Sequence, residues 1–178
     1  MKILTLLRHA KSSWDDKVPR DFDRPLNARG RKAAVTVGRE LRAQGLAFDK
    51  VIASSAVRVV ETLSSLWEGY GDQLEPEHEA DLYLASPAAL LERIQAVDDG
   101  VDRLLVVGHN PGLEQLALML TDGDPVKLRE QLALKYPTAT VAEISLPVDR
   151  WADVREGGGT LTRFIRPRDL DPELGPDD

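Results

Sequence analysis

The sequence lacks cysteine altogether, which excludes disulfide bonds, thiol catalysis and metal sites built on thiolates. Positively charged residues are also fewer than negatively charged ones: the sequence has 23 Lys and Arg and 30 Asp and Glu, which gives a net charge of -7. General nucleic-acid binding needs a basic face, so it is not expected. An acidic chain that binds an anion must gather its cations in one place, and the positions of its arginines are therefore informative.

Long hydrophobic runs are absent as well. The first apolar run follows Lys2, is interrupted by Thr5 and ends at Arg8. This run is too short for the apolar region of a signal peptide or for a membrane-spanning helix. We expect no membrane association and a cytoplasmic location.

The composition is otherwise that of an ordinary globular protein, with 42% hydrophobic and 30% charged residues in a chain of 178. Neither a repeat nor a linker divides the sequence, so residues 1–166 are predicted to form a single domain. Residues 167–178 are rich in Pro and Asp and predict a loose C-terminal tail. The sequence sets no oligomeric state.

Short apolar stretches alternate with helical patterns in the first part of the chain. Residues 2–7, 48–53 and 103–107 are typical of buried parallel strands, and each precedes a helical pattern. Residues 10–26 show no periodicity and predict a loop long enough to cover a site. Helix starts are predicted at Asn27, at Ser54 or Ser55, at Ser86-Pro87 and at Asn110-Pro111, with a further helix over residues 125–134.

The remaining segments complete the prediction of the fold. Residues 68–80 are polar and predict a connecting loop, and residues 82–84 predict either a short edge strand or an extended turn. Residues 140–146 and 160–165 predict an antiparallel pair, since three consecutive glycines lie between them. The sequence thus predicts an α/β fold with three layers, α/β/α, and a mainly parallel sheet with an antiparallel edge.

Two of the three histidines directly follow predicted strands. Arg8 and His9 end the first strand, and His109 follows the strand over residues 103–107. In an open α/β sheet the functional groups gather beyond the carboxyl ends of the strands, so we expect these residues at the mouth of a site. A third junction carries Arg58, expected at the third helical position, where helix N-termini favour anions. Taken alone, Arg58 is more typical of a solvated helix residue or a partner of Glu61, but together with the other two junctions it favours an anion site.

A phosphoryl group suits this set of residues. Histidine can act as a covalent nucleophile, and arginine donates two parallel hydrogen bonds to phosphate. Nearby Arg8 and Arg58 are expected to lower the pKa of His9, because a like charge disfavours the protonated form. Other chemistries lack their motifs, since no P-loop, no zinc-type histidine pair and no Gly-x-Ser-x-Gly elbow is present.

Three motifs carry a resemblance to a known family. Residues 7–12 (LRHAKS), 54–62 (SSAVRVVET) and 107–112 (VGHNPG) resemble the histidine phosphatase superfamily, which includes the cofactor-dependent phosphoglycerate mutases. The small size, Ala10 and the segments 23–27, 135–138 and 166–170 look most like its SixA-type phosphohistidine phosphatase branch. The resemblance extends from Lys2 to about Leu170, and it departs from the best-known Arg-His-Gly pattern at Ala10.

The resemblance implies a phosphoglycerate mutase-like fold and roles for individual residues. His9 would attack phosphorus, while Arg8, Arg58 and a protonated His109 would hold the phosphoryl oxygens. The family implies no metal ion and no cofactor. Lys11 and Ser12 follow the nucleophile and Asn110 follows His109, so these three are candidates for substrate binding, with ordinary loop polar groups as the alternative.

A proton donor to the leaving group is harder to place. The acidic candidates lie in one polar stretch: Glu75, Glu77, Glu79 and Asp81. Asp81 is the best placed as general acid, with a solvated loop acid as the alternative, and His78 is expected at the surface. Trp14 is expected either to line the mouth of the site or to pack beneath the loop.

The leaving group separates three hypotheses of function. A phosphohistidine has a weak P–N bond and needs less acid catalysis than an alkyl ester. The leading hypothesis is therefore a metal-independent phosphatase with a phosphohistidine intermediate on His9, acting on phosphohistidine of a signalling or phosphotransfer protein. The alternatives are a small-molecule phosphomonoesterase and a non-catalytic module that binds a phosphorylated ligand.

Overall fold

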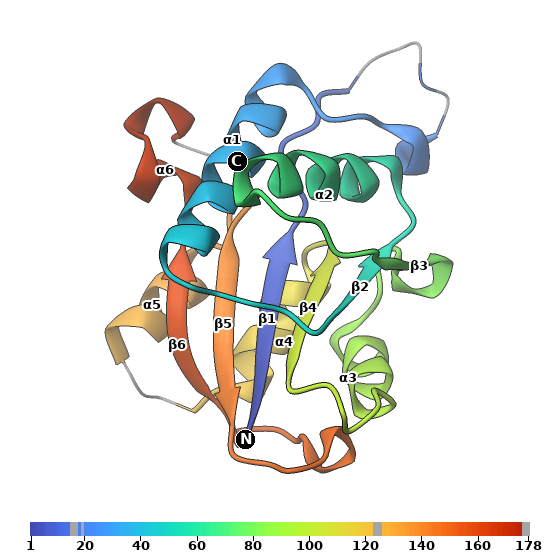
Figure 1. Cartoon of the computed structure of the whole chain (residues 1–178), viewed down its shortest axis with the longest axis vertical. Coiled ribbons are helices and arrows are strands. Elements are labelled where there is room, and N and C mark those ends of the chain that lie inside the picture. Colours follow the sequence, from blue (N-terminus) through green and yellow to red (C-terminus); the bar gives the residue numbers. More distant parts are fainter. Residues whose placement is uncertain (15–17, 19, 123–125, 176–178) are drawn as a thin grey trace.

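The computed structural model describes residues 1–14, 18, 20–122 and 126–175. A six-stranded sheet in the order β3-β2-β4-β1-β5-β6 forms its centre (Figure 1). The strands are β1 (Lys2–Arg8), β2 (Lys50–Ser54), β3 (Glu77–Glu79), β4 (Arg103–Gly108), β5 (Val141–Leu146) and β6 (Thr160–Ile165). The first four are parallel to one another, and β5 runs antiparallel to β1 and β6. The predicted parallel sheet with an antiparallel edge is confirmed.

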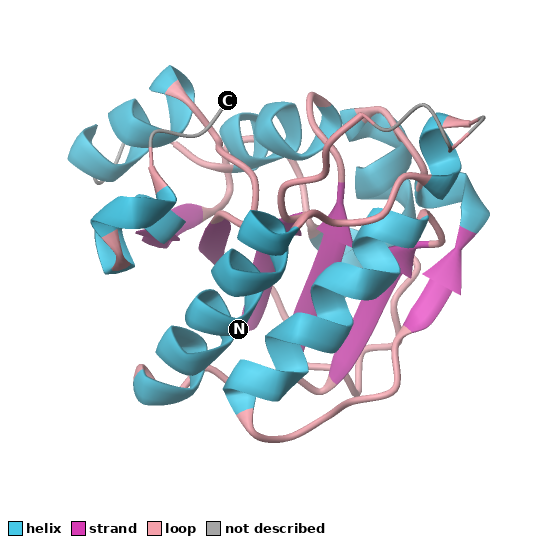
Figure 2. Ribbon diagram, turned by 90° about the horizontal axis from the view of Figure 1, so that it is seen from above, coloured by secondary structure: helices cyan, strands magenta, loops and turns pink. Residues whose placement is uncertain are grey.

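Helices cover both faces of the sheet, as Figures 1 and 2 show from two directions. α1 (Ala28–Ala43) and α2 (Val57–Tyr70) lie on one face. α3 (Pro87–Gln95), α4 (Gly112–Leu120) and α5 (Val126–Leu134) lie on the other. The predicted three-layer α/β/α architecture is confirmed.

The inner strands are apolar on both faces because each face is covered by a helix layer. β4 directs Leu105 and Val107 into the core beneath α1 and α2, and Leu104 and Val106 into the core beneath α3 and α4. All four side chains are fully buried. Burying a side chain of this kind contributes about 1.5–3 kcal/mol to the stability of the fold. Because successive side chains of β4 point to opposite faces, the strand stabilises the packing of both helix layers on the sheet.

The position of α1 follows from local sequence signals. The Asn27 side chain accepts a hydrogen bond from the Gly30 N–H at 2.7 Å, and the helix ends before Gly45, whose φ is +75°. Both termini were predicted. A Cβ at Gly30 would lie 2.1 Å from the Lys11 carbonyl oxygen. Only glycine therefore lets the segment after β1 lie directly on α1.

Two predicted helix starts are wrong by one or two residues. α2 begins at Val57 with Ala56 as its N-cap residue, so neither Ser54 nor Ser55 caps it. Ser54 is instead the last residue of β2, where its hydroxyl faces the site described below. Arg58 is therefore the second helical residue and not the third. α4 begins at Gly112, after a cis Asn110–Pro111 bond, with Pro111 as the N-cap residue.

The edge strand lies earlier than predicted. Residues 77–79 form β3, whereas residues 80–82 form a 3-10 turn that buries Leu82. The sequence suggested a loop because β3 carries no hydrophobic residue. Its carboxylates are balanced by cations from neighbouring elements, with Glu77 against Lys50 at 2.6 Å and Glu79 against Arg93 at 2.8 Å.

The predicted loose tail is wrong for residues 167–175, and residues 176–178 lie outside the described residues. α6 (Pro167–Leu170) and the 3-10 turn Pro172–Leu174 fold against α1. Leu174 is buried in the core beneath α1 and α2, and Lys32 of α1 forms ion pairs with Asp171 and Glu173. Within the parts of the chain that the structure describes, no helix combines the length and apolar character needed to cross a membrane.

Candidate active site

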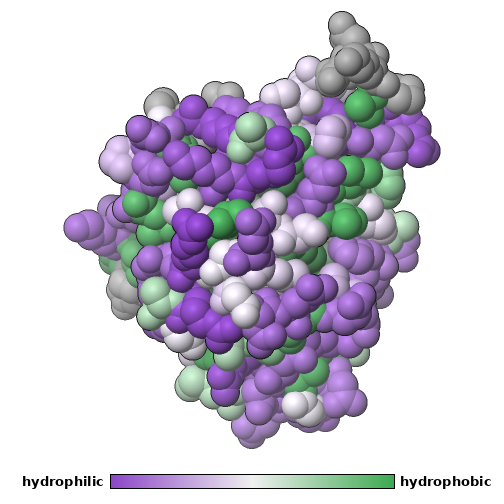
Figure 3. Space-filling model, turned by 45° about the horizontal axis from the view of Figure 1, so that its top comes forward, coloured by the Kyte–Doolittle hydropathy of each residue, from purple (hydrophilic) through white to green (hydrophobic). Residues whose placement is uncertain are grey.

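A pocket of about 680 Å³ lies at the carboxyl ends of β1, β2 and β4. Figure 3, which brings this end of the molecule forward, shows mainly hydrophilic residues on that face. Four of the residues that line the pocket are Lys or Arg, and Asp21 is the one carboxylate among the described lining residues. The lining residues are Arg8, His9, Lys11, Ser12, Trp14, Asp21, Arg24, Arg58, Tyr83, Leu84, His109, Asn110 and Thr138. The three strand-to-helix junctions meet here, as the sequence predicted.

Hydrogen bonds of both the backbone and the ring fix the position of His9. Its N–H donates to the Gly108 carbonyl at 3.0 Å, and its carbonyl accepts from Ala139 N–H at 3.0 Å. The ring Nδ1 lies 2.7 Å from the Ala10 carbonyl oxygen, which can only accept, so Nδ1 carries the hydrogen. The lone pair is therefore on Nε2, which faces Arg58 Nε at 3.4 Å.

The surroundings of His9 keep its ring neutral. The side chain is only 8% exposed. Burial foremost, with added effects of Arg8, His109 and Arg58, lowers the pKa of His9 to about 3. The sequence pointed to the arginines as the cause, but loss of hydration on burial is the larger effect. At neutral pH His9 is thus an unprotonated base whose free nitrogen faces a cationic pocket.

Arg58 is 3% exposed and uses both edges of its guanidinium group. Nη1 donates to the Asp21 carbonyl at 2.8 Å, and Nη2 donates to Asp21 Oδ2 at 3.0 Å. Nε donates toward His9 Nε2. Glu61, the alternative partner from the sequence, instead accepts from the Leu26 N–H at 2.9 Å. Arg58 is therefore part of the pocket.

His109 completes the group, with its ring centroid 5.3 Å from that of His9. Arg58 Nη2 lies 3.3 Å from His109 Nδ1, and an arginine can only donate, so Nδ1 accepts. Nε2–H then donates to Ser54 Oγ at 2.8 Å. Burial and Arg58 lower the pKa of His109 to about 4, although Asp21 opposes them. The resemblance implied a protonated His109, whereas burial and the neighbouring Arg58 favour the neutral ring here.

The remaining predicted binding residues line the pocket with different partners. Arg8 Nη1 and Asn110 Nδ2 both donate to the Tyr136 carbonyl, each at 3.0 Å. Arg8 and Asn110 thus both hold the backbone at Tyr136. Ser12 Oγ accepts from Arg24 Nη1 at 2.7 Å, and Lys11 lies on the pocket wall.

Asp21, Arg24 and Tyr83 are residues of the pocket that sequence reasoning missed. Asp21 accepts from the Tyr83 hydroxyl and from Arg24 Nε, the latter at 2.8 Å. Burial alone would raise the pKa of Asp21, but hydrogen bonds from Tyr83, Arg24 and Arg58 outweigh it and lower the pKa to about 2. The sequence offered one signal for this group: Asp21 and Arg24 are three residues apart, a spacing typical of a turn closed by an ion pair.

Asp81 does not reach this pocket. Its side chain is exposed and lines a separate hollow with Glu79 and Arg93. It is therefore not placed to protonate a leaving group at His9. Trp14 lines the mouth, 75% exposed, with the Arg24 guanidinium 4.1 Å from its ring centroid. His78 lies exposed on β3, as predicted.

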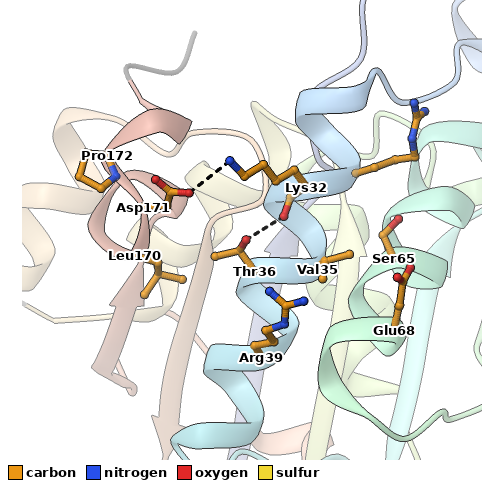
Figure 4. A pocket seen from close by; sticks show the side chains of 10 residues that line it. Lys32, Val35, Thr36, Arg39, Ser65, Glu68, Leu170, Asp171 and Pro172 are labelled. Atoms are coloured by element: carbon orange, nitrogen blue, oxygen red, sulfur yellow. Dashed lines mark hydrogen bonds and ion pairs between the residues drawn. The ribbon is translucent and has the colours of Figure 1, made fainter.

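A second hollow of about 570 Å³ lies between α1, α2 and the C-terminal segment. Figure 4 shows Lys32 reaching across it to Asp171, with a nitrogen–oxygen distance of 3.4 Å. No histidine lines it, so it lacks the nucleophile that the first pocket holds. Among the described residues, no group of three or more His, Cys, Asp or Glu is arranged to hold a metal ion.

Both pocket histidines are expected to stay neutral well below the ordinary histidine pKa of about 6.5. Their pKa values of about 3 and about 4 are lowered, so protonation is expected only on strong acidification. Ring resonances followed by NMR from about pH 8 to about pH 5 should show no titration for either residue. His9→Ala and His109→Ala assign the signals, and a midpoint near pH 6.5 for either ring would contradict the structure.

Known proteins resemble this chain in sequence and in fold. The sequence profile of the histidine phosphatase superfamily (branch 1) matches residues 4–83. The uncharacterized Mycobacterium tuberculosis protein Rv1276c is 37% identical over 164 residues, which cover 91% of this chain and 100% of that protein. A structure assigned to the phosphohistidine phosphatase SixA, from Nakamurella multipartitia, superimposes with a TM-score of 0.79 at 28% identity, over 93% of this chain and 96% of that one. A protein histidine phosphatase SixA solved with tungstate shares the fold at 21% identity, with a TM-score of 0.77 over 95% and 99% of the two chains.

Proposed function

The chain belongs to the histidine phosphatase superfamily, and we propose that it hydrolyses protein phosphohistidine through a covalent intermediate on His9. The observation that carries the proposal is the state of the His9 ring. Its Nδ1–H is bound by the Ala10 carbonyl, which leaves the Nε2 lone pair facing Arg58 inside a cationic pocket. A neutral, oriented nitrogen is what nucleophilic attack on phosphorus requires.

The reaction has two displacements at phosphorus. In the first, His9 Nε2 forms a bond to phosphorus while the bond from phosphorus to the substrate nitrogen breaks, and the substrate nitrogen takes up a proton from solvent water. In the second, a water oxygen forms a bond to the phosphorus of phosphorylated His9 while the bond from phosphorus to Nε2 breaks, so that phosphate and a proton are released to solvent and the neutral ring returns. Arg8 and Arg58 stabilise the charge on the phosphoryl oxygens in both steps, since phosphoryl transfer depends mainly on positioning and electrostatics.

Among the described residues, the pocket holds no acid suited to protonate a leaving group, and this favours phosphohistidine over an alkyl phosphate. Asp21 is the carboxylate among the described lining residues, and its lowered pKa of about 2 keeps it ionised. It therefore has no proton to give at neutral pH. Asp81 lies at another hollow. An alkoxide leaving group needs a proton donor, whereas an imidazole departs from a weak P–N bond with less help.

A comparison of two substrates tests the proposal. Phosphate release is measured at about pH 7 from a phosphohistidine-bearing protein and from p-nitrophenyl phosphate. We expect kcat/KM to be at least about tenfold higher for phosphohistidine, because its P–N bond is weaker than the P–O bond of the ester.

Other outcomes lead to different functions. Comparable turnover of the aryl ester would indicate a small-molecule phosphomonoesterase. Binding of inorganic phosphate without turnover of either substrate would indicate a non-catalytic module that binds phosphorylated ligands.

A further inference from the structure

We propose that Asp21 is a positioning residue that clamps one edge of the Arg58 guanidinium, so that the other edge faces the phosphoryl group between His9 and His109. The proposal rests on the proposed function, since it assigns a part in that reaction. Asp21 opens a 3-10 turn, Asp21–Asp23, in the loop between β1 and α1.

The two edges of Arg58 have separate partners. The outer edge, Nη1 and Nη2, donates to the backbone carbonyl and to the carboxylate of the same residue, Asp21. The inner edge, Nε and Nη2, is directed at His9 Nε2 and at His109 Nδ1, at 3.4 and 3.3 Å. A phosphoryl group on His9 would thus meet two parallel N–H donors, which is the bidentate geometry that arginine offers to phosphate.

Asp21 is itself fixed from two other directions. Arg24 Nε donates to Oδ1, and the Tyr83 hydroxyl donates to Oδ2, the same oxygen that Arg58 uses. The Tyr83 ring packs edge-on against His109, with 5.2 Å between centroids, and against Phe22 at 5.0 Å. Three donors on one carboxylate leave it little freedom to rotate, so the orientation of Arg58 depends on a rigid group.

The negative charge of Asp21 distinguishes a clamp on Arg58 from a residue that only stabilises the structure of the pocket. A carboxylate beside a phosphate site repels the anion that the site binds. A clamp of this kind therefore opposes phosphate binding while it orients Arg58 for the reaction. Removing the charge is expected to tighten phosphate binding and slow turnover, whereas loss of a merely structural residue would weaken both.

Asp21→Asn tests this, with Asp23→Asn as the matched control. Asp23 lies in the same turn and pairs with the exposed Arg20, and it is not among the pocket-lining residues. For Asp21→Asn we expect the dissociation constant of inorganic phosphate to fall about tenfold and kcat for p-nitrophenyl phosphate to fall about tenfold or more. Asp23→Asn should change neither by more than about twofold. Asp21→Glu, which restores the charge, should return phosphate affinity toward that of the unaltered protein.

The Arg58 Nε–H resonance provides a readout that needs no turnover. In the unaltered protein, added phosphate should shift this resonance, and in Asp21→Asn the proton should exchange with water faster. Parallel losses of affinity and kcat, or an unchanged resonance in Asp21→Asn, would overturn the clamp. An unaltered protein that turns over neither substrate would refute the proposed function instead, and the phosphate titration and the resonance would still decide the clamp.

Discussion

Replacing His9 with alanine is expected to lower kcat by more than about 10³-fold on any phosphorylated substrate. The reason is that the variant has no nitrogen to form the covalent intermediate, and water must then attack the substrate directly. The measurement is phosphate release under substrate saturation, together with acid-labile labelling of the protein during turnover.

The His9→Ala variant has a matched control in His78→Ala. His78 is exposed on β3, outside the pocket, so its replacement should change kcat by less than about twofold. The cations of the pocket remain in His9→Ala, and phosphate should still bind. Residual activity above about a tenth of normal, or a labelled His9→Ala protein, would place the nucleophile elsewhere.

Replacing Arg58 with alanine is expected to lower kcat/KM by about 10³-fold. The size of this effect is taken from other phosphoryl transfer enzymes, in which one arginine that stabilises the transition state raises kcat by about 10³- to 10⁵-fold. Arg58→Lys should recover little, because an ammonium group lacks the two parallel donors that face His9 and His109. Arg39→Ala, on the exposed side of α1, is the control and should behave as the unaltered protein.

Arg58→Ala is also expected to change the pKa values of the two pocket histidines. Arg58 lowers the pKa of both His9 and His109, so its removal should raise both pKa values. A higher pKa favours the protonated, non-nucleophilic ring at acidic pH, and in a pH–rate profile the loss of activity should therefore grow as the pH falls from about 8 toward the raised pKa values. A loss below tenfold at about pH 8 would exclude Arg58 from the reaction.

Local patterns were sufficient to predict most of the fold. The alternation of apolar residues in β4 and the Asn27 cap of α1 depend on neighbours within a few residues, and both were read correctly. The edge strand β3 was missed because its residues are charged. Lys50 and Arg93 balance these charges, and neither lies in the same stretch of sequence.

The sequence by itself determined the α/β layers and the meeting of Arg8, His9, Arg58 and His109, because parallel strands bring their carboxyl ends to one edge of the sheet. Only the tertiary structure decided how these groups are oriented and charged. Asp21 clamps Arg58 from 37 residues away, and Tyr83 holds Asp21 from 62 residues away. Burial, more than the adjacent arginines, sets the neutral state of both histidines. Burial and such long-range hydrogen bonds exist only once the chain is folded, and no local pattern of residues encodes them.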